Sequence, residues 1–172
     1  SHAARLNKRN NVTSMALRAI HKDIIEMERN PPEECYAECV NMDEEPHFWQ
    51  AMFKGPEASP YAGGMFYMSI WIGADYPYQA PIFKFTSPIY HPGINSRGEM
   101  LLPVVERGWG PDMSIRKAIL AIHAYLADNN ADDPLRQDIA KQYRYEREKF
   151  NETAQAWTRK YAQYDGPGAD ST

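Results

Sequence analysis

Apolar residues recur at three- and four-residue spacing near the start of the chain and again through its last third. This is the period of an amphipathic helix. In the first stretch, residues 15–29, the apolar positions are Leu17, Ile20, Ile24 and Met27. Thr13 or Ser14 can cap the helix, and Pro31 and Pro32 can end it. The sequence therefore predicts a first helix over residues 15–29.

Four runs of β-branched, aromatic and sulfur-containing residues follow this helix. They cover residues 35–40, 47–53, 65–72 and 82–85. Glycine, proline and aspartate separate the runs with turn-forming segments, which predicts an antiparallel meander of four strands. The third run alternates, and the members expected to lie under a helix are Phe66, Met68, Ile70 and Ile72.

Residues 86–111 keep no period, because eight prolines and glycines interrupt them. An irregular segment of this length inside a compact domain is uncommon and is usually functional, so we expect the functional site here. Within it, the apolar run 100–105 is interpreted as either a short buried strand or a partly exposed patch suited to a partner. The tryptophans interpreted as core or loop-packing residues are Trp49, Trp71 and Trp109.

Helical spacing returns after this segment, at Ile115, Ala118, Ile119, Ile122 and Leu126. Asp112 or Ser114 can cap this helix. Further on, Asp133 is a suitable N-cap with Pro134 at the first helical position, and the pattern beyond it predicts two helices or one bent helix. A helix, a meander, a long loop and further helices together predict an α+β fold.

The composition narrows the class of protein. A chain of 172 residues suits one domain, and we expect a flexible arm over residues 1–12, the domain over 13–164 and a flexible tail over 165–172. Apolar residues make up 43% of the chain, and the longest apolar run has six residues, far short of the roughly 20 of a membrane helix. The net charge of −4 gives no general attraction to nucleic acid. These features favour a cytoplasmic or nuclear protein with no membrane and no nucleic-acid partner.

The two cysteines of the chain, Cys35 and Cys39, fall in the first predicted strand. On one face of a strand, residues four apart are separated by about 13 Å, at roughly 3.3 Å per residue. A disulfide needs Cα atoms within about 7 Å, so these two cannot bridge each other. We expect two reduced cysteines, with no metal and no cofactor.

Several short motifs, in the same order as the predicted elements, resemble the ubiquitin-conjugating enzymes over about residues 15–161. The matching strings are Phe48-Trp49-Gln50-Ala51, Gly55-Pro56, Ser59-Pro60-Tyr61, Gly63-Gly64, Asp75-Tyr76-Pro77, Ile89-Tyr90-His91-Pro92, Ile94-Asn95-Ser96 and Ala131-Asp132-Asp133-Pro134-Leu135. Each string alone is weak, and their shared order and spacing carry the resemblance. It implies the α+β fold of that family, with an N-terminal helix, a four-stranded antiparallel meander, a long active-site-type loop and C-terminal helices.

The chain departs from this family where the family's chemistry lies. Leu101 stands at the position of the catalytic cysteine, Gly93 at that of an asparagine and Pro103 at that of an aspartate. Thioester exchange needs a thiolate, which leucine lacks. Glycine has no amide dipole for a developing oxyanion, and proline has no carboxylate to orient an incoming lysine. The resemblance therefore implies a pseudoenzyme of this transferase family, with a vestigial site that Leu101→Cys alone is not expected to restore.

Two further residues belong to this vestigial site. His91 is interpreted as a hydrogen-bonding residue that shapes the loop rather than as a base. Asp133 keeps an acidic position of the family, although a role as a helix cap is enough to explain it.

The resemblance also implies two docking surfaces. RING-type ligases bind the family on the first helix and two loops, where the matching residues are Arg18, Lys22, Tyr78 and Pro111. Ala19 and Asp112 depart from close relatives, so this surface is only partly kept. Some members bind ubiquitin on the open face of the sheet through a small residue of the first strand. Tyr36 stands there and is expected to block or reshape that contact.

Hypotheses from different classes follow from the sequence. The first is a non-catalytic protein that binds ubiquitin or a ubiquitin-like protein, an active conjugating enzyme or a RING-type ligase. The second is an interaction scaffold that has left the ubiquitin pathway. A weaker third is an active conjugating enzyme with displaced chemistry.

Overall fold

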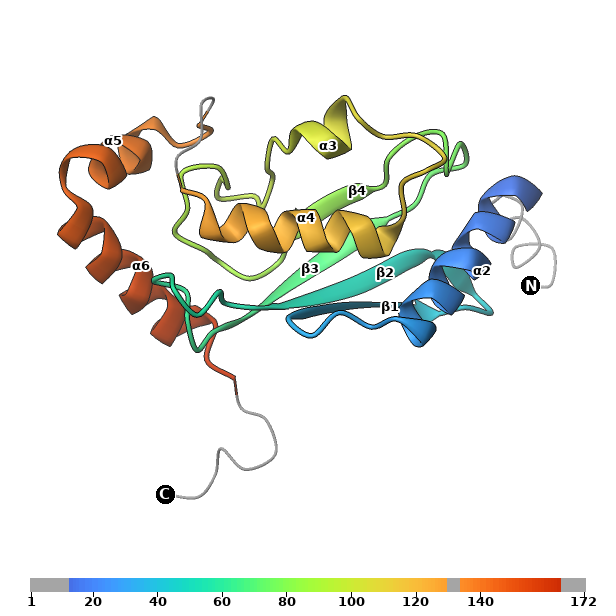
Figure 1. Cartoon of the computed structure of the whole chain (residues 1–172), viewed down its shortest axis with the longest axis horizontal. Coiled ribbons are helices and arrows are strands. Elements are labelled where there is room, and N and C mark those ends of the chain that lie inside the picture. Colours follow the sequence, from blue (N-terminus) through green and yellow to red (C-terminus); the bar gives the residue numbers. More distant parts are fainter. Residues whose placement is uncertain (1–12, 130–133, 165–172) are drawn as a thin grey trace, which may run out of the picture.

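The computed structural model describes residues 13–129 and 134–164, in which helices pack on one face of an antiparallel sheet (Figure 1). The predicted arm 1–12, the predicted tail 165–172 and Asp133 lie outside the described residues. The predicted α+β fold is confirmed, and the predicted limits of the first helix and of the four strands lie within two residues of the observed ones.

The first helix, α2 (Ser14–Arg29), begins where a side chain can satisfy its free backbone amides. The Thr13 hydroxyl accepts a hydrogen bond from the backbone N–H of Ala16 at 3.1 Å, so Thr13 is the N-cap. The helix buries one stripe against the domain: Ala16, Ile20, Asp23 and Met27. Three of these are apolar, and the fourth is a carboxylate that requires partners inside the protein.

The sheet consists of β1 (Cys35–Asn41), β2 (Glu45–Lys54), β3 (Met65–Trp71) and β4 (Ile82–Phe85), in that order and all antiparallel. Residues in register form rows across all four strands, and one such row is Ala37, Ala51, Met68 and Phe85. This row is buried. The next row along the strands points the other way, because side chains alternate between faces.

The inner face of the sheet carries the core. Phe66, Met68, Ile70 and Ile72 are all buried, as the alternation in the third strand predicted. The helix α4 (Ile115–Ala127) lies across this face (Figure 1). Trp49 belongs to the core, but Trp71 does not: it lies on the outer face and is 45% exposed, so its interpretation as a core or loop-packing residue was wrong. Trp71 directly follows the buried Ile70 along β3, so its side chain points to the opposite face of the sheet.

The irregular segment between β4 and α4 contains one short helical turn, α3 (Pro103–Glu106). The strand suggested for residues 100–105 is therefore wrong, because Pro103 cannot donate to a sheet and instead occupies the first turn of a helix. Downstream, Ser114 rather than Asp112 caps α4, since its hydroxyl accepts from the Lys117 N–H at 3.2 Å.

Two C-terminal helices, α5 (Gln137–Tyr145) and α6 (Arg147–Tyr161), lie at the end of the sheet opposite α2 (Figure 1). The α5 helix begins at Gln137 with Arg136 as its N-cap, so the prediction that Pro134 is its first helical residue was wrong. Backbone bonds tie this end to the domain, from Arg136 N to Pro92 O and from Met65 N to Ala162 O. None of the helices in the described residues is long and apolar enough to cross a bilayer.

Candidate functional site

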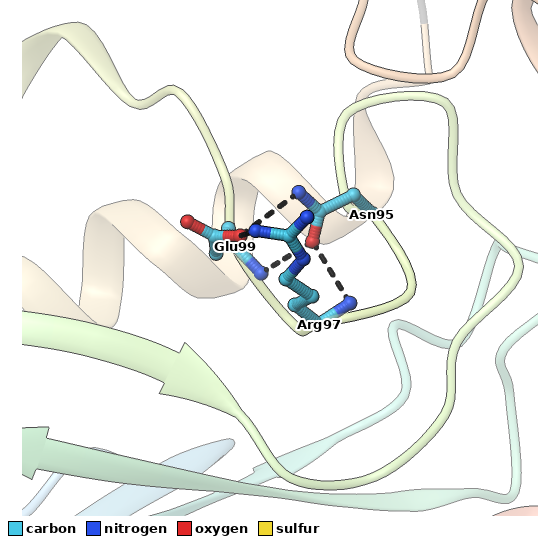
Figure 2. A network of polar contacts seen from close by, with 3 residues as sticks. All are labelled: Asn95, Arg97 and Glu99. Atoms are coloured by element: carbon cyan, nitrogen blue, oxygen red, sulfur yellow. Dashed lines mark hydrogen bonds and ion pairs between the residues drawn. The ribbon is translucent and has the colours of Figure 1, made fainter.

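Four of the five residues of the predicted vestigial site, His91, Gly93, Leu101 and Pro103, lie in residues 91–103, which we call the cleft loop. The loop folds back on itself through isolated bridges between His91 and Ile94 and between Ile94 and Met100. The chain reverses between these bridges at Asn95, whose side-chain oxygen accepts from the backbone N–H groups of Arg97 at 3.0 Å and Glu99 at 2.9 Å (Figure 2). This is the local turn chemistry that favours asparagine, and it holds the loop without help from a substrate.

Gly98 joins the cleft loop to the edge of the sheet. Its φ is +79°, in the left-handed region that favours glycine, and its carbonyl accepts from the Phe85 N–H at 2.9 Å. A Cβ at this position would lie 1.9 Å from the Phe85 carbonyl oxygen. The loop is therefore attached to β4, on the opposite edge of the sheet from β1.

His91 lies at the base of the cleft loop and is fully buried. Its Nδ1 accepts from the Gly93 N–H at 2.9 Å, and its Nε2 lies 3.1 Å from the carbonyl oxygen of Tyr125. A neutral imidazole that carries its proton on Nε2 satisfies both contacts. Burial lowers the pKa of His91 to about 4, which favours this neutral form. Its position makes it a structural link between the loop and α4.

Tyr125, on α4, occupies the space beside Gly93. Its hydroxyl donates to the Gly93 carbonyl at 3.2 Å, and its ring centroid lies 5.2 Å from that of His91. A Cβ on Gly93 would lie only 1.9 Å from the Tyr125 hydroxyl oxygen. The room for a side chain at position 93 is thus filled by a phenol. Sequence analysis missed Tyr125, because it falls outside the apolar stripe of α4.

The residues around Leu101 divide between surface and core. Leu101 is 36% exposed, Leu102 is 8% exposed and Met100 is half-buried. The partly exposed apolar patch therefore centres on Leu101. Pro103 is exposed and begins α3, where its carbonyl accepts from the Arg107 N–H at 2.9 Å. The chain offers neither a thiol nor a carboxylate at these positions.

Neither cysteine lies in the cleft loop. Both thiols are free, and both are on β1, across the sheet from the edge that holds the loop. Cys35 faces α4, since its thiol lies 3.8 Å from the carbonyl oxygen of Ile119. Burial raises the pKa of Cys35 to about 11, and it also raises the pKa of Cys39. Both thiols therefore stay protonated near neutral pH, which is the unreactive form.

The four residues predicted to bind a ligase line one groove between α2, the loop that joins β3 to β4 and the loop that precedes α4. The groove has a volume of about 500 Å³, and the predicted residues in its wall are Arg18, Lys22, Tyr78 and Pro111. Tyr78 is 62% exposed. We call this the α2–α4 groove. Ala19 and Asp112, which depart from the family pattern, line it as well.

Buried polar contacts hold the walls of the α2–α4 groove together. Asp23 of α2 accepts from the Tyr76 hydroxyl with one oxygen and from the Ile115 N–H at 3.2 Å with the other. Burial is the main reason that the pKa of Asp23 rises to about 6. Trp109 donates its indole N–H to the Pro77 carbonyl at 2.9 Å, which joins the two loops. The groove is thus a fixed shape built by three elements.

The remaining predicted residue, Tyr36, lies half-buried on the outer face of β1, in register with Met52. Across residues 13–129 and 134–164, no group of three histidine, cysteine, aspartate or glutamate side chains is arranged to hold a metal ion.

Comparison with known proteins agrees with this architecture. A family model described as ubiquitin-conjugating enzyme matches residues 19–158. Among solved structures, the chain is similar to one described as a ubiquitin conjugating enzyme E2 domain from Toxoplasma gondii. The two are 34% identical with a TM-score of 0.76, and the match covers 84% of this chain and 97% of that one. With its N-terminal helix, four-stranded antiparallel sheet and C-terminal helices, the chain belongs to the ubiquitin-conjugating enzyme family.

Proposed function

We propose that this chain is a non-catalytic member of its family that takes part in ubiquitin or ubiquitin-like transfer by binding. Its partner is ubiquitin or a ubiquitin-like protein, an active conjugating enzyme or a RING-type ligase. The observation that carries the proposal is the identity of residue 101, a leucine where the family pattern has its nucleophilic cysteine. A leucine side chain can neither form a thioester nor release one.

The other thiols support this proposal by their position. A substitute nucleophile has to reach the carboxyl end of a bound ubiquitin in the cleft. Cys35 is turned into the core toward α4, and Cys39 lies on the same strand, across the sheet from the cleft loop. The raised pKa of each thiol further reduces the thiolate fraction at neutral pH.

The space around position 93 gives a second line of support. An oxyanion-stabilising donor would have to extend from this position, and the Tyr125 hydroxyl already occupies that space. Tyr125 also donates to the Gly93 carbonyl. The cleft loop is therefore stabilised in a form that suits a glycine, and a change at Leu101 alone leaves that form in place.

The α2–α4 groove supports the binding half of the proposal. Its lining includes three cationic residues, Arg18, Lys22 and Lys117, beside the exposed ring of Tyr78 and the exposed Pro111. Exposed aromatic and cationic side chains around a preformed hollow are typical of protein-binding sites. A RING-type ligase is the partner that this groove fits best within the family.

Two measurements test the proposal. The first incubates the purified chain with activating enzyme, ATP and ubiquitin, with an active conjugating enzyme as the positive control. We expect no adduct that disappears on reduction, and such an adduct would refute the non-catalytic assignment.

The second measurement titrates RING domains into labelled chain and compares Tyr78→Ala with Tyr145→Ala, which removes a somewhat more exposed tyrosine outside the groove. We expect only Tyr78→Ala to weaken binding, by about tenfold or more.

A further inference from the structure

The outer face of the sheet, where Tyr36 is expected to block or reshape the ubiquitin contact of some family members, has an ordered arrangement of side chains. The middle of this face is formed by Tyr36, Glu38, Phe48, Gln50, Met52, Tyr67, Ser69, Trp71, Ile82 and Lys84, and Lys54 and Met65 continue it at one end of β2 and β3. Several are large, apolar and well exposed: Tyr67 is 47% exposed, Trp71 45% and Ile82 66%. Exposed apolar groups gathered on one sheet face mark an interaction surface.

The strand register divides this face into three rows. One apolar row runs through Tyr36, Met52 and Tyr67, and a second runs through Phe48, Trp71 and Ile82. Between them lies a polar row of Glu38, Gln50, Ser69 and Lys84. The polar row begins with an acid on the β1 edge and ends with a base on the β4 edge. Across residues 13–129 and 134–164, neither Glu38 nor Lys84 takes part in an ion pair.

We propose that two copies of this chain associate face to face through the outer face of the sheet, about a twofold axis parallel to the strands. This axis exchanges the two edges of the sheet and leaves each row opposite itself. Glu38 of each copy then lies opposite Lys84 of the other, which gives two equivalent ion pairs. Each apolar row meets its own counterpart, so Trp71 packs against the apolar row of the second copy.

The charge pattern selects this axis over the other twofold arrangement of two stacked sheets. An axis perpendicular to the strands would place Glu38 opposite Glu38 and Lys84 opposite Lys84. Like charges opposed across an interface are unfavourable, whereas alternating charges fix the register. The surface is self-complementary only about the parallel axis, as an isologous dimer requires.

Sheet twist is compatible with this packing. Face-to-face sheets pack about 10 Å apart, with their strands rotated by about 30°. The outer strands of four lie about 7 Å from the middle of the sheet, at roughly 4.8 Å per strand. A rotation of about 30° displaces the edges relative to each other by about 4 Å. The side chains of Glu38 and Lys84 are long enough to absorb that displacement.

The size of the face predicts a weak dimer. The three rows span four residues along each strand, about 13 Å, and the four strands span about 14 Å. Even with side chains included, this patch is smaller than the roughly 800 Å² per partner of a standard stable interface. We therefore expect reversible association that is visible at about 100 µM chain and weakens with salt, because the edge pairs are exposed.

Sedimentation equilibrium of the full chain tests the proposal. We expect a monomer–dimer equilibrium, and Trp71→Glu should shift it to monomer because it places a carboxylate within an apolar row. The melting temperature of this variant checks its fold, which should survive because the residue is half-exposed. A wild-type chain that stays monomeric at about 200 µM would overturn the proposal. Binding of labelled ubiquitin to the same face by such a monomeric chain would not rescue it.

Charge reversal provides the decisive version of this test. Glu38→Lys alone and Lys84→Glu alone each turn both ion pairs into like-charge contacts, and each should weaken self-association by about tenfold. An equimolar mixture of the two variants forms heterodimers with both pairs attractive, and so should associate about as well as wild type. The controls are Glu152→Lys on α6 and Lys141→Glu on α5, which make the same changes away from the outer face. A mixture no stronger than its components would refute the parallel axis.

Discussion

The cleft loop and the α2–α4 groove lie in the same domain but make different demands on their side chains. The chemistry that the family performs in the cleft depends on particular atoms, a sulfur, an amide and a carboxylate, none of which occurs at positions 101, 93 and 103. The groove depends on shape and charge. Its walls are joined by the buried contacts of Asp23, and the ring of Tyr78 is exposed.

A binding surface and a reaction centre respond differently to the exchange of side chains. A groove tolerates exchange of one aromatic or apolar residue for another, since partial contact still contributes to affinity. A nucleophile has no partial substitute. In the cleft loop, Tyr125 in addition fills the space next to Gly93.

Reactivation of the cleft should require four changes. Leu101→Cys alone restores the thiol, and we expect its discharge to free lysine to remain at least about a hundredfold below that of an active conjugating enzyme, because donor and carboxylate are still missing. Pro103→Asp adds the carboxylate, and Gly93→Asn adds an amide whose side chain meets the Tyr125 hydroxyl. The further change Tyr125→Ala makes room for this side chain.

Single-turnover discharge of charged protein measures this effect. The four-residue variant should exceed the three-residue variant that keeps Tyr125, and it should exceed the product of the individual effects, since these groups act as a unit. Efficient discharge by Leu101→Cys alone would contradict the proposal that the cleft loop lacks more than the thiol needed for transfer.

Gly98→Ala should break the cleft loop, whereas Gly110→Ala should leave the groove unchanged. A methyl at position 98 meets the Phe85 carbonyl in a left-handed backbone conformation, which we expect to cost about 3 kcal/mol of unfolding free energy. A methyl at position 110 meets nothing within 4 Å, so its effect should lie within about 0.5 kcal/mol. Urea denaturation of both variants checks the pair, and equal losses would contradict the prediction.

The pH dependence of stability should be nearly flat between about pH 4 and 6 in the wild type, because two buried groups oppose each other. His91 has a pKa lowered to about 4, so the unfolded chain binds its proton first, and acidification below pH 6.5 costs stability. Asp23 has a pKa raised to about 6, so the folded chain binds its proton first, and acidification below pH 6 restores stability. Each shift corresponds to about 3 kcal/mol.

Asp23→Asn should expose the His91 contribution. The variant should lose about 3 kcal/mol more than wild type on acidification from pH 6.5 to pH 4, because the compensating carboxylate is gone. Urea melts at several pH values measure the difference, with the exposed Asp112→Asn as the control. A variant that keeps the wild-type pH profile would show that the two groups are not balanced.

The smallest effect is expected at Arg97 on the tip of the cleft loop. Its guanidinium lies 3.8 Å from the Glu99 carboxylate, and both side chains are well exposed, so Arg97→Ala should change stability by less than about 0.5 kcal/mol (Figure 2). Asn95→Ala removes the acceptor for two backbone N–H groups and should cost about 1 to 2 kcal/mol. Thermal melts compare the stability lost by the two variants. A larger loss for Arg97→Ala than for Asn95→Ala would show that the ion pair, and not the Asn95 side chain, stabilises the turn.

The local pattern of apolar and polar residues was enough to predict the first helix, the four strands and α4. The spacing of Ile20 and Met27 and the alternation of Phe66, Met68 and Ile70 each report which side of an element meets the core, because helices and strands have fixed periods. The same pattern was not enough at the start of α5, where Pro134 resembled a first helical residue but Arg136 is held to Pro92 across the domain. Contacts distant in the sequence decided that boundary.

The candidate site divides in the same way. The absence of a thiol at position 101, the glycine at 93 and the proline at 103 are properties of the sequence itself, since no packing can supply a missing functional group. The tertiary structure alone decided three other relations. Tyr125 closes the space at Gly93, and Asp23 joins α2 to Tyr76. Glu38 and Lys84 lie at the two ends of one row, on opposite edges of the sheet. Each of these relations joins residues at least 32 positions apart, beyond the reach of any helical or strand period.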